Sequence, residues 1–180
     1  SNTNLSLSDK NATTETKILY KNLAQFVNKG ILFGHQDDLA YGVNWKYEAG
    51  RSDVKEVTGD YPSVYGWDLA GLEKKSDKNI DGIPFDKMRQ YIKEGHSRGG
   101  IITLSWHFDN PLTGKNAWDI TPKSLASALS GGESHEKFKS WLDEGVKFIL
   151  TLKDKNGKPI PILYRPYHEL TGTWFWWCKN

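Results

Sequence analysis

The chain has few of the residues that mark disulfide-rich, membrane-spanning or nucleic-acid-binding proteins. Cys178 is the only cysteine, which excludes an internal disulfide and any metal cluster built from cysteines. No apolar run approaches the roughly 20 residues that span a bilayer, so no membrane insertion is expected. The net charge is only +2 and the lysines are scattered, so we also expect no nucleic-acid partner.

Tryptophan, in contrast, is abundant, with 8 in 180 residues. Five of the tryptophans stand beside polar residues or glycine instead of inside apolar runs: Trp106, Trp118, Trp174, Trp176 and Trp177. Aromatic faces can pack against the C–H bonds of a sugar ring, so at least two of them are expected to face a ligand. For Trp176 and Trp177 the alternative is packing under the following loop.

The length of 180 residues is enough for one domain with a substantial core. Residues 1–16 are polar and rich in Asn, Ser and Thr, which predicts a surface arm, with a frayed terminus as the alternative. Residues 17–180 are predicted to form the folded domain.

Helical and strand patterns alternate along the chain, as judged from apolar spacing and from glycines that close the helices. Helices are predicted over 14–28, around 54–57, over 85–98 and within 133–152, and strands over 31–36, 62–68, 101–107 and 161–165. The strands look apolar on both sides, which is typical of a parallel sheet covered by helices. The fold class predicted is therefore α/β.

Polar and aromatic residues follow the end of each predicted strand, at 35–38, 67–68, 106–107 and 168–169. In a (β/α)8 TIM barrel the carboxyl ends of all strands share one face, and that face is catalytic. An open doubly wound sheet would also place ligands at strand ends. The repetition at four strands favours the barrel.

The segment from Arg165 to Trp177, with its His-Glu pair and three tryptophans, resembles the acid/base motif of family 26 glycoside hydrolases. Members of that family are chiefly endo-β-1,4-mannanases. Residues 105–111 with Thr113 and Gly114 resemble the third-strand segment of the family. Residues 34–36 and 66–68 resemble its first two strands.

The resemblance implies a retaining glycosidase that cleaves internal β-1,4-mannosidic bonds in mannan, galactomannan or glucomannan. Glu169 would be the general acid/base, a role for which an aromatic surround favours the protonated form. His168 would bind near the C2 hydroxyl of the sugar at the cleavage point, and Trp174 would line the cleft. His107 and Trp118 look like further substrate contacts. The partner is a β-mannan polysaccharide or manno-oligosaccharide, and no cofactor is implied.

The family's nucleophile is a second glutamate at the end of the seventh strand, whereas four strands are predicted here. A complete barrel takes about 250 residues. We therefore expect this chain to cover about the first four βα units, the N-terminal half of the catalytic domain. The fragment alone would be inactive, because the remaining half of the barrel must supply the nucleophile.

Three alternatives remain at this point. A non-catalytic carbohydrate-binding protein would use the tryptophans without a nucleophile. The same fold could act on β-1,3-xylan or mixed-linkage β-glucan. A metal-dependent barrel hydrolase could use His35, His107, His168 and Asp68, but no His-x-His pair lies on the first strand, so no metal is expected.

Two residues are predicted to support the site. Asp68 would hold substrate or support a neighbour. For Arg165, the role of a buried partner of a carboxylate is favoured over that of a substrate contact. Because polymeric mannan lies outside the cytosol, an extracellular, cell-surface or periplasmic location is expected.

Overall fold

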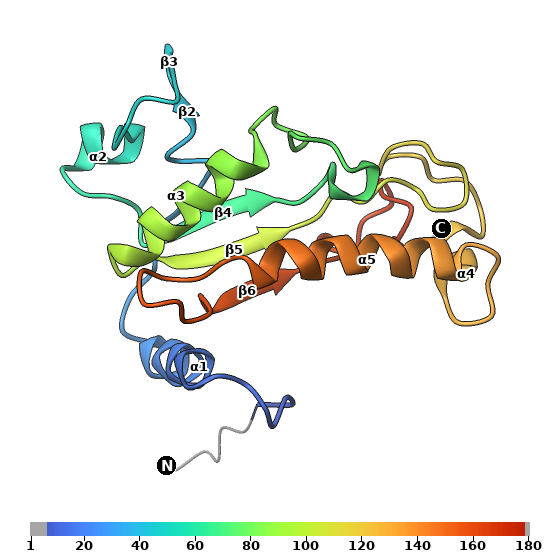
Figure 1. The fold of residues 1–180 in the computed structure, drawn as a ribbon, viewed down its shortest axis with the longest axis horizontal. Coiled ribbons are helices and arrows are strands. Elements are labelled where there is room, and N and C mark those ends of the chain that lie inside the picture. The colour runs from blue at the N-terminus through green and yellow to red at the C-terminus, as the bar shows by residue number, and fades with distance from the viewer. Residues whose placement is uncertain (1–6, 179–180) are drawn as a thin grey trace.

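The centre of the structure, a computed structural model that describes residues 7–178, is a sheet of four parallel strands. These are β1 (Gly34–Gln36), β4 (Val64–Asp68), β5 (Ile101–Ser105) and β6 (Ile162–Arg165). Their order in the sheet, β1-β4-β5-β6, is also their order in the chain. Figure 1 shows the arrows of β4, β5 and β6 side by side and pointing the same way. The predicted parallel α/β sheet is confirmed.

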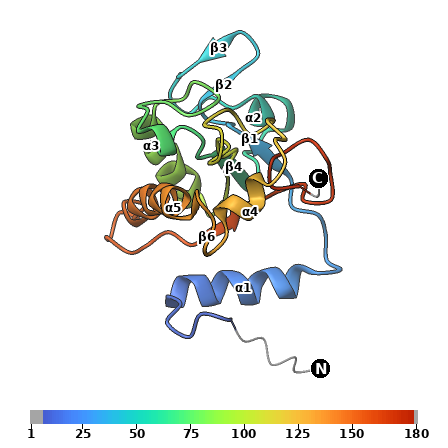
Figure 2. The ribbon, with the colours of Figure 1, turned by 90° about the vertical axis from the view of Figure 1, so that its right-hand side faces the viewer.

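Two long helices lie on one side of this sheet. α3 (Phe85–Ser97) joins β4 to β5, and α5 (His135–Leu150) precedes β6. Both views show these helices next to each other on the same side of the strands (Figures 1 and 2). The remaining elements are α1 (Thr14–Phe26), β2 (Tyr41–Gly42), β3 (Trp45–Lys46), α2 (Asp53–Thr58), the 3-10 helix η1 (Leu72–Lys74) and α4 (Ser124–Ala128). None of the helices within residues 7–178 is long and apolar enough to cross a membrane.

The side of the sheet that faces the helices carries the apolar core. Tyr65 and Trp67 of β4 are fully buried, as are Ile102 and Leu104 of β5. The parallel register pairs Tyr65 with Ile102 and Trp67 with Leu104, so these side chains point the same way. The ring of Trp67 stacks on Tyr91 of α3 with 5.7 Å between the ring centroids. Burial of these large side chains holds α3 against the sheet.

The opposite side of the sheet is small and polar. It carries Gly66 and Asp68 from β4 and Thr103 and Ser105 from β5. The prediction that the strands are apolar on both sides is therefore wrong for β4 and β5. A Cβ atom at Gly66 would collide with the side-chain oxygen of Gln36, so glycine makes room there for the polar end of β1.

The first strand is shorter than predicted. β1 begins at Gly34, and the predicted strand residues Ile31 and Phe33 are 97% and 60% exposed. Within the described residues, β1 pairs only with β4, so its other edge is not covered. The prediction of a short buried strand over 31–36 is therefore wrong.

The first helix begins inside the stretch predicted as a polar arm, residues 1–16. The side chain of Thr13 caps α1 by accepting a hydrogen bond from the backbone N–H of Thr16 (3.2 Å). The first six residues of the arm lie outside the described part. The helix ends two residues before the predicted Asn28, because Val27 has ψ of 128°. The other predicted helices and strands agree with the structure to within two residues at each end.

Replacement of Gly145 by alanine is expected to destabilise the fold. Gly145 of α5 is buried, and an added Cβ atom would collide with the indole ring of Trp106. Such overpacking typically costs about 1–3 kcal/mol, more than the gain of about 1 kcal/mol from replacing a helical glycine. Urea unfolding would measure the difference. Val146→Ala, at a position of the same helix that is 53% exposed, is the control. A Gly145→Ala variant as stable as the parent would contradict this packing.

Candidate active site

A cavity of about 390 Å³ opens at the carboxyl ends of the four strands. Its walls are Gln36, Asp68, Ser105, His107, Arg165, His168 and Glu169 from the strand ends, with Ile80, Asp81 and Trp118 from the connecting loops. All four predicted strand ends therefore contribute to one cavity. This convergence is what parallel strands in one sheet impose.

A larger cavity of about 740 Å³ lies at the other end of the sheet. It is bounded by α1 and by the segments that lead into β4 and β5. Size alone would select it, but Glu169 and both histidines that follow β5 and β6 line the smaller cavity. The chemistry therefore places the candidate site at the carboxyl ends.

Glu169 is held in an unusual backbone conformation. Pro166 follows directly on β6, and Tyr167 and Glu169 then have φ of 51° and 57°. Positive φ is uncommon outside glycine and tends to occur at functional sites, where the surrounding structure maintains it. The carbonyl of Glu169 accepts a hydrogen bond from the N–H of Gly172 (2.8 Å), which closes this turn.

Trp174 contacts the carboxyl group of Glu169 directly. Its indole N–H donates to Oε2 of Glu169 at 2.7 Å. The indole ring lies so close to Gly172 that a Cβ atom there would collide with it. Because 48% of Trp174 is still exposed, the residue offers aromatic surface beside the carboxyl group.

The other tryptophans of this segment have a different role. Trp176 and Trp177 are 2% and 1% exposed, so both are packed inside the fold and do not face a ligand. The indole of Trp176 donates to the carbonyl of Phe108, and that of Trp177 donates to the carbonyl of His168, each at 3.0 Å. The first bond joins the segments that follow β5 and β6, and the second closes the segment after β6 on itself.

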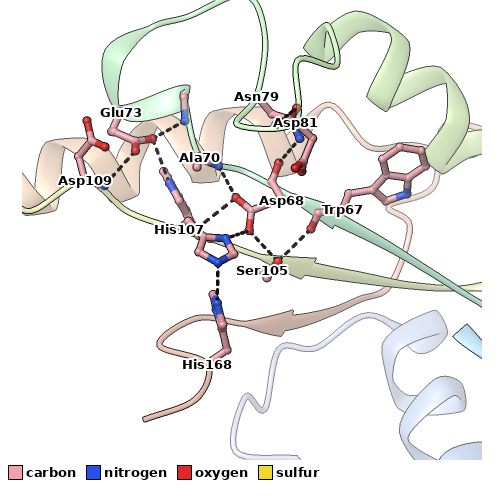
Figure 3. Close-up of polar contacts among 12 residues, drawn as sticks. Trp67, Asp68, Ala70, Glu73, Asn79, Asp81, Ser105, His107, Asp109 and His168 are labelled. Atoms are coloured by element: carbon pink, nitrogen blue, oxygen red, sulfur yellow. Dashed lines mark hydrogen bonds and ion pairs between the residues drawn. The ribbon is translucent and has the colours of Figure 1, made fainter. Parts of the chain in front are cut away.

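Asp68, His107 and His168 form a hydrogen-bonded chain along the wall of the cavity (Figure 3). Oδ2 of Asp68 lies 2.7 Å from Nδ1 of His107, and Nε2 of His107 lies 3.1 Å from Nε2 of His168. Asp68 also accepts hydrogen bonds from the hydroxyl of Ser105 and from the backbone N–H groups of Ala70 and His107. Asp68 thus supports a neighbour, one of its two predicted roles.

The pKa values of Asp68, His107 and His168 are shifted by their contacts within this hydrogen-bonded chain. Burial is the largest single effect on the pKa of Asp68 and would raise it, but the hydrogen bond and charge of His107, with the hydrogen bonds from Ala70 and Ser105, together lower the pKa. Burial is also the largest single effect on the pKa of His107 and would lower it, but the hydrogen bond and charge of Asp68, with the charges of Asp81 and Glu169, together raise the pKa. Burial and then the nearby His107 lower the pKa of His168. Of the two imidazoles, His168 is therefore the one that stays neutral to lower pH.

Trp118 and His107, both predicted as substrate contacts, lie side by side in the wall of the cavity. Their rings are stacked, with 5.3 Å between centroids and an angle of 16°. Trp118 is 49% exposed, so it adds a second aromatic surface to that of Trp174. Ile80, 46% exposed, also lines the cavity.

Arg165 lines the cavity but is not the buried partner of a carboxylate that the sequence suggested. It is exposed, and it makes no ion pair with the carboxylates of residues 7–178. The physical reason is its place on β6, which has a neighbouring strand on one side only in the described chain. The prediction of burial is wrong for this chain.

Asp37, just after β1, was not predicted as a site residue. It is 1% exposed, and its Oδ2 accepts a hydrogen bond from the hydroxyl of Tyr41 at 3.0 Å. Burial, with a further contribution from the charge of Asp81, raises the pKa of Asp37 to about 7. The other oxygen of Asp37, Oδ1, is buried without a hydrogen-bond partner. The sequence shows Asp37 only as a polar residue after a strand.

Glu73 of η1 is a second buried carboxylate that sequence reasoning missed. It accepts hydrogen bonds from the backbone N–H groups of Gly71 (2.8 Å) and Asp109 (3.1 Å) and from the indole of Trp106 (3.0 Å). Figure 3 shows it to the left of Asp68 and His107. In the sequence it is followed by two lysines and a serine, which is typical of a solvent-exposed loop, so no signal marked it. Its position connects the loops after β4 and β5.

No group of three or more His, Cys, Asp or Glu side chains within residues 7–178 is arranged to hold a metal ion. Of the four residues weighed for such a site, Asp68, His107 and His168 bond to one another. His35 instead lies near Asp38, with 3.7 Å between Nδ1 and Oδ1.

Comparison with known proteins identifies the family. The sequence model of glycosyl hydrolase family 26 matches residues 8–180. The chain belongs to glycosyl hydrolase family 26. One family 26 relative, the mannan endo-1,4-beta-mannosidase of Bifidobacterium adolescentis, is 39% identical over 96% of this chain and 17% of its own length. The Bacillus subtilis protein of the same name is 28% identical over 93% of this chain and 46% of its own length.

Solved family 26 structures share the fold. The GH26 beta-mannanase BoMan26A of Bacteroides ovatus is 50% identical and superposes with a TM-score of 0.91 over 93% of this chain and 49% of its own. An endo-beta-1,4-mannanase double mutant from Cellulomonas fimi is 34% identical, with a TM-score of 0.83, over 93% of this chain and 38% of its own. The predicted (β/α)8 TIM barrel is confirmed, and this chain spans less than half the length of the family 26 proteins compared here.

Proposed function

We propose that this chain is part of a retaining endo-β-1,4-mannanase in which Glu169 is the general acid/base. The observation that carries the proposal is the position of Glu169 after β6, in a cavity that two histidines and the exposed Trp118 also line. The exposed Trp174 does not line this cavity but donates a hydrogen bond to the carboxyl group of Glu169. The family 26 relatives named as mannan endo-1,4-beta-mannosidases support mannan as the substrate class. Galactomannan and glucomannan contain the same bond.

The reaction needs two carboxyl groups about 5–5.5 Å apart. Protonated Glu169 gives its proton to the leaving glycosidic oxygen while a carboxylate nucleophile attacks the anomeric carbon. In the second step, ionised Glu169 takes a proton from water, and the resulting hydroxide displaces the nucleophile from the glycosyl-enzyme. The same stereochemistry is therefore restored at the anomeric carbon.

Asp68 is unsuited to be the nucleophile, although it lines the same cavity. Both of its oxygens already accept two hydrogen bonds, and the residue is 1% exposed. An attacking carboxylate must instead offer a free oxygen to the sugar. We propose that the nucleophile is a glutamate beyond residue 180, because this chain covers only 17–46% of the length of the curated relatives named above.

The substrate contacts proposed are Trp174, Trp118, His107 and His168, with Asp68 and Arg165 in supporting positions. The two exposed tryptophans supply apolar faces, and the histidines supply polar groups at the strand ends. The Nε2 atom of His168 is engaged by His107 and its Nδ1 is buried. A contact between His168 and the C2 hydroxyl therefore requires the sugar to share or open the His107–His168 hydrogen bond.

Trp174→Ala in the complete parent protein is expected to raise the KM for mannotriose and longer oligosaccharides about tenfold, because a lost aromatic contact worth about 1.5 kcal/mol corresponds to that factor. Trp174→Phe keeps an aromatic face but removes the N–H that contacts Glu169. It should retain most of the binding. Steady-state kinetics on oligosaccharides of increasing length would test both variants. An unchanged KM for Trp174→Ala would remove this tryptophan from the cleft.

The substrate class is tested by assaying the complete parent on a panel of mannans, β-1,3-xylan and mixed-linkage β-glucan. Hydrolysis of mannan with retained configuration is the expected result. Binding of mannan without hydrolysis would favour the alternative of a carbohydrate-binding protein. We also propose an extracellular, cell-surface or periplasmic location, since polymeric mannan is found there, and cell fractionation would test it.

A further inference from the structure

The side chain of Asp68 is held in one orientation by two backbone N–H groups, which can only donate. Oδ1 accepts from the backbone N–H groups of Ala70 (2.9 Å) and His107 (3.2 Å). Oδ2 accepts from the hydroxyl of Ser105 (2.8 Å) and faces Nδ1 of His107 (2.7 Å). Backbone N–H groups only donate, whereas a hydroxyl can rotate and an imidazole can change tautomer. Asp68 is ionised and accepts on both oxygens, so Nδ1 of His107 carries a proton.

The proton on Nδ1 of His107 determines where the other ring protons of the hydrogen-bonded chain lie. A neutral imidazole carries one proton, so neutral His107 has a bare Nε2. The facing Nε2 of His168, 3.1 Å away, must then carry a proton and donate it. The Nδ1 of His168, which is buried and has no partner, is left as an unprotonated acceptor. This arrangement avoids a buried N–H without an acceptor, which would cost about 1–3 kcal/mol.

We propose that Asp68 is a positioning residue that, through His107, fixes the tautomer of His168 beside Glu169. The inference rests on the proposed function for its consequence in the reaction, since His168 is the proposed contact of the C2 hydroxyl. Figure 3 shows the three side chains joined in sequence by dashed lines, and all three line the cavity. Only a His168 that carries its proton on Nε2 presents a donor at the point where the sugar would enter the hydrogen bond.

Asp68→Asn is a sharp test because the two backbone donors also fix the orientation of the amide. The amide oxygen must take the place of Oδ1, since an NH₂ group there would face two N–H donors. The NH₂ group then faces His107, whose Nδ1 has to become an acceptor. His107 moves its proton to Nε2, and His168 moves its own to the buried Nδ1. The substitution therefore reverses both tautomers with little change in shape.

Other charged groups act on the two histidines through their charges. Asp81 and Glu169 act in this way on His107, and Arg165 and Glu169 on His168. Asp81→Asn is therefore the matched control: it removes a nearby negative charge by the same chemical change and leaves the hydrogen bonds of His107 in place. It should lower the pKa of His107 without changing either tautomer.

The measurement is long-range ¹H–¹⁵N NMR of ¹⁵N-histidine-labelled complete parent protein, which distinguishes the two tautomers of each ring. At pH 8 the parent and Asp81→Asn should show protons on Nδ1 of His107 and Nε2 of His168. Asp68→Asn should show both reversed, and its kcat on mannan should fall at least tenfold with KM changed less than threefold. Observation of the same His168 tautomer in Asp68→Asn as in the parent would overturn the proposal.

If Asp68→Asn does not fold, a pH titration of the unmodified parent tests the proposal instead. Protonation of His107 at acidic pH turns its Nε2 into a donor, so His168 should move its proton to Nδ1 in the same step. A His168 tautomer that stays constant while His107 gains its proton would refute the coupling. Both NMR measurements are independent of mannanase activity, so a failure of the proposed function is recognised separately by the absence of mannan hydrolysis.

Discussion

Replacement of Glu169 by alanine in the complete parent protein is expected to cut turnover on mannan by about 10²–10⁴-fold, the usual contribution of a general acid/base. Glu169 lines the cavity at the end of β6 and is exposed, so the fold should remain intact. Steady-state kinetics would measure the loss, and circular dichroism would check the fold. Retention of more than about a tenth of the parent's activity would contradict the assignment.

A substrate with a good leaving group separates the two roles of Glu169. An aryl β-mannobioside whose phenolate departs without a proton does not need the acid in the first step. The Glu169→Ala variant should then form the glycosyl-enzyme quickly and release it slowly, which gives a burst of phenol before a slow steady state. Glu169→Gln is the isosteric control and should behave in the same way. A variant that loses the first step equally on both substrates would point to a damaged site instead of a missing acid.

Asp37→Asn is expected to stabilise the protein by about 4 kcal/mol above pH 7. The pKa of Asp37 is raised from 3.8 to about 7 because the side chain is buried and faces Asp81. Its protonated form is therefore favoured by folding, and this contribution is complete below pH 3.8 and lost as the pH rises through 7. A shift of roughly three pKa units corresponds to about 4 kcal/mol. Asparagine stays neutral, can still accept from Tyr41, and tolerates the φ of 58° at this position.

Urea unfolding at pH 5 and pH 8 would measure the effect of Asp37→Asn. The gain should be smaller at pH 5, where most of Asp37 is already protonated in the folded protein. Asp143→Asn, at an exposed position of α5, is the control and should change stability equally at both pH values. If Asp37→Asn adds no stability at pH 8, the carboxyl group is not desolvated as the structure indicates.

The order of strands and helices was predictable because local patterns determine it. The apolar runs at 62–68 and 101–107 mark strands whose helix-facing side chains form the core. The spacing of apolar residues marks α3 and α5 in the same way. Glu169 was predictable because a long motif surrounds it. The polar side of β4 and β5 was not predictable in the same way, because Gly66, Asp68, Thr103 and Ser105 alternate with large apolar residues in short strands.

Features that depend on contacts between distant parts of the sequence could not be predicted from the sequence. The hydrogen bond between His107 and His168 joins residues 61 positions apart and appears only when β5 and β6 pair. Asp37 is buried, accepts a hydrogen bond from Tyr41 of β2 and feels the charge of Asp81, which lies 44 positions away in the sequence. The exposure of Arg165 follows from its place on a strand with an uncovered edge. No local pattern distinguishes these residues from polar residues on a surface.

The hydrogen bond from Trp174 to Glu169 assigns different tasks to the two carboxyl oxygens. Oε2 already accepts a hydrogen bond, so when Glu169 is protonated its proton resides on Oε1. The same atom must then reach the departing oxygen in the first step and the incoming water in the second. The leaving alcohol and the water are therefore expected to occupy a single position in succession, so that the alcohol has to depart before the glycosyl-enzyme can be hydrolysed.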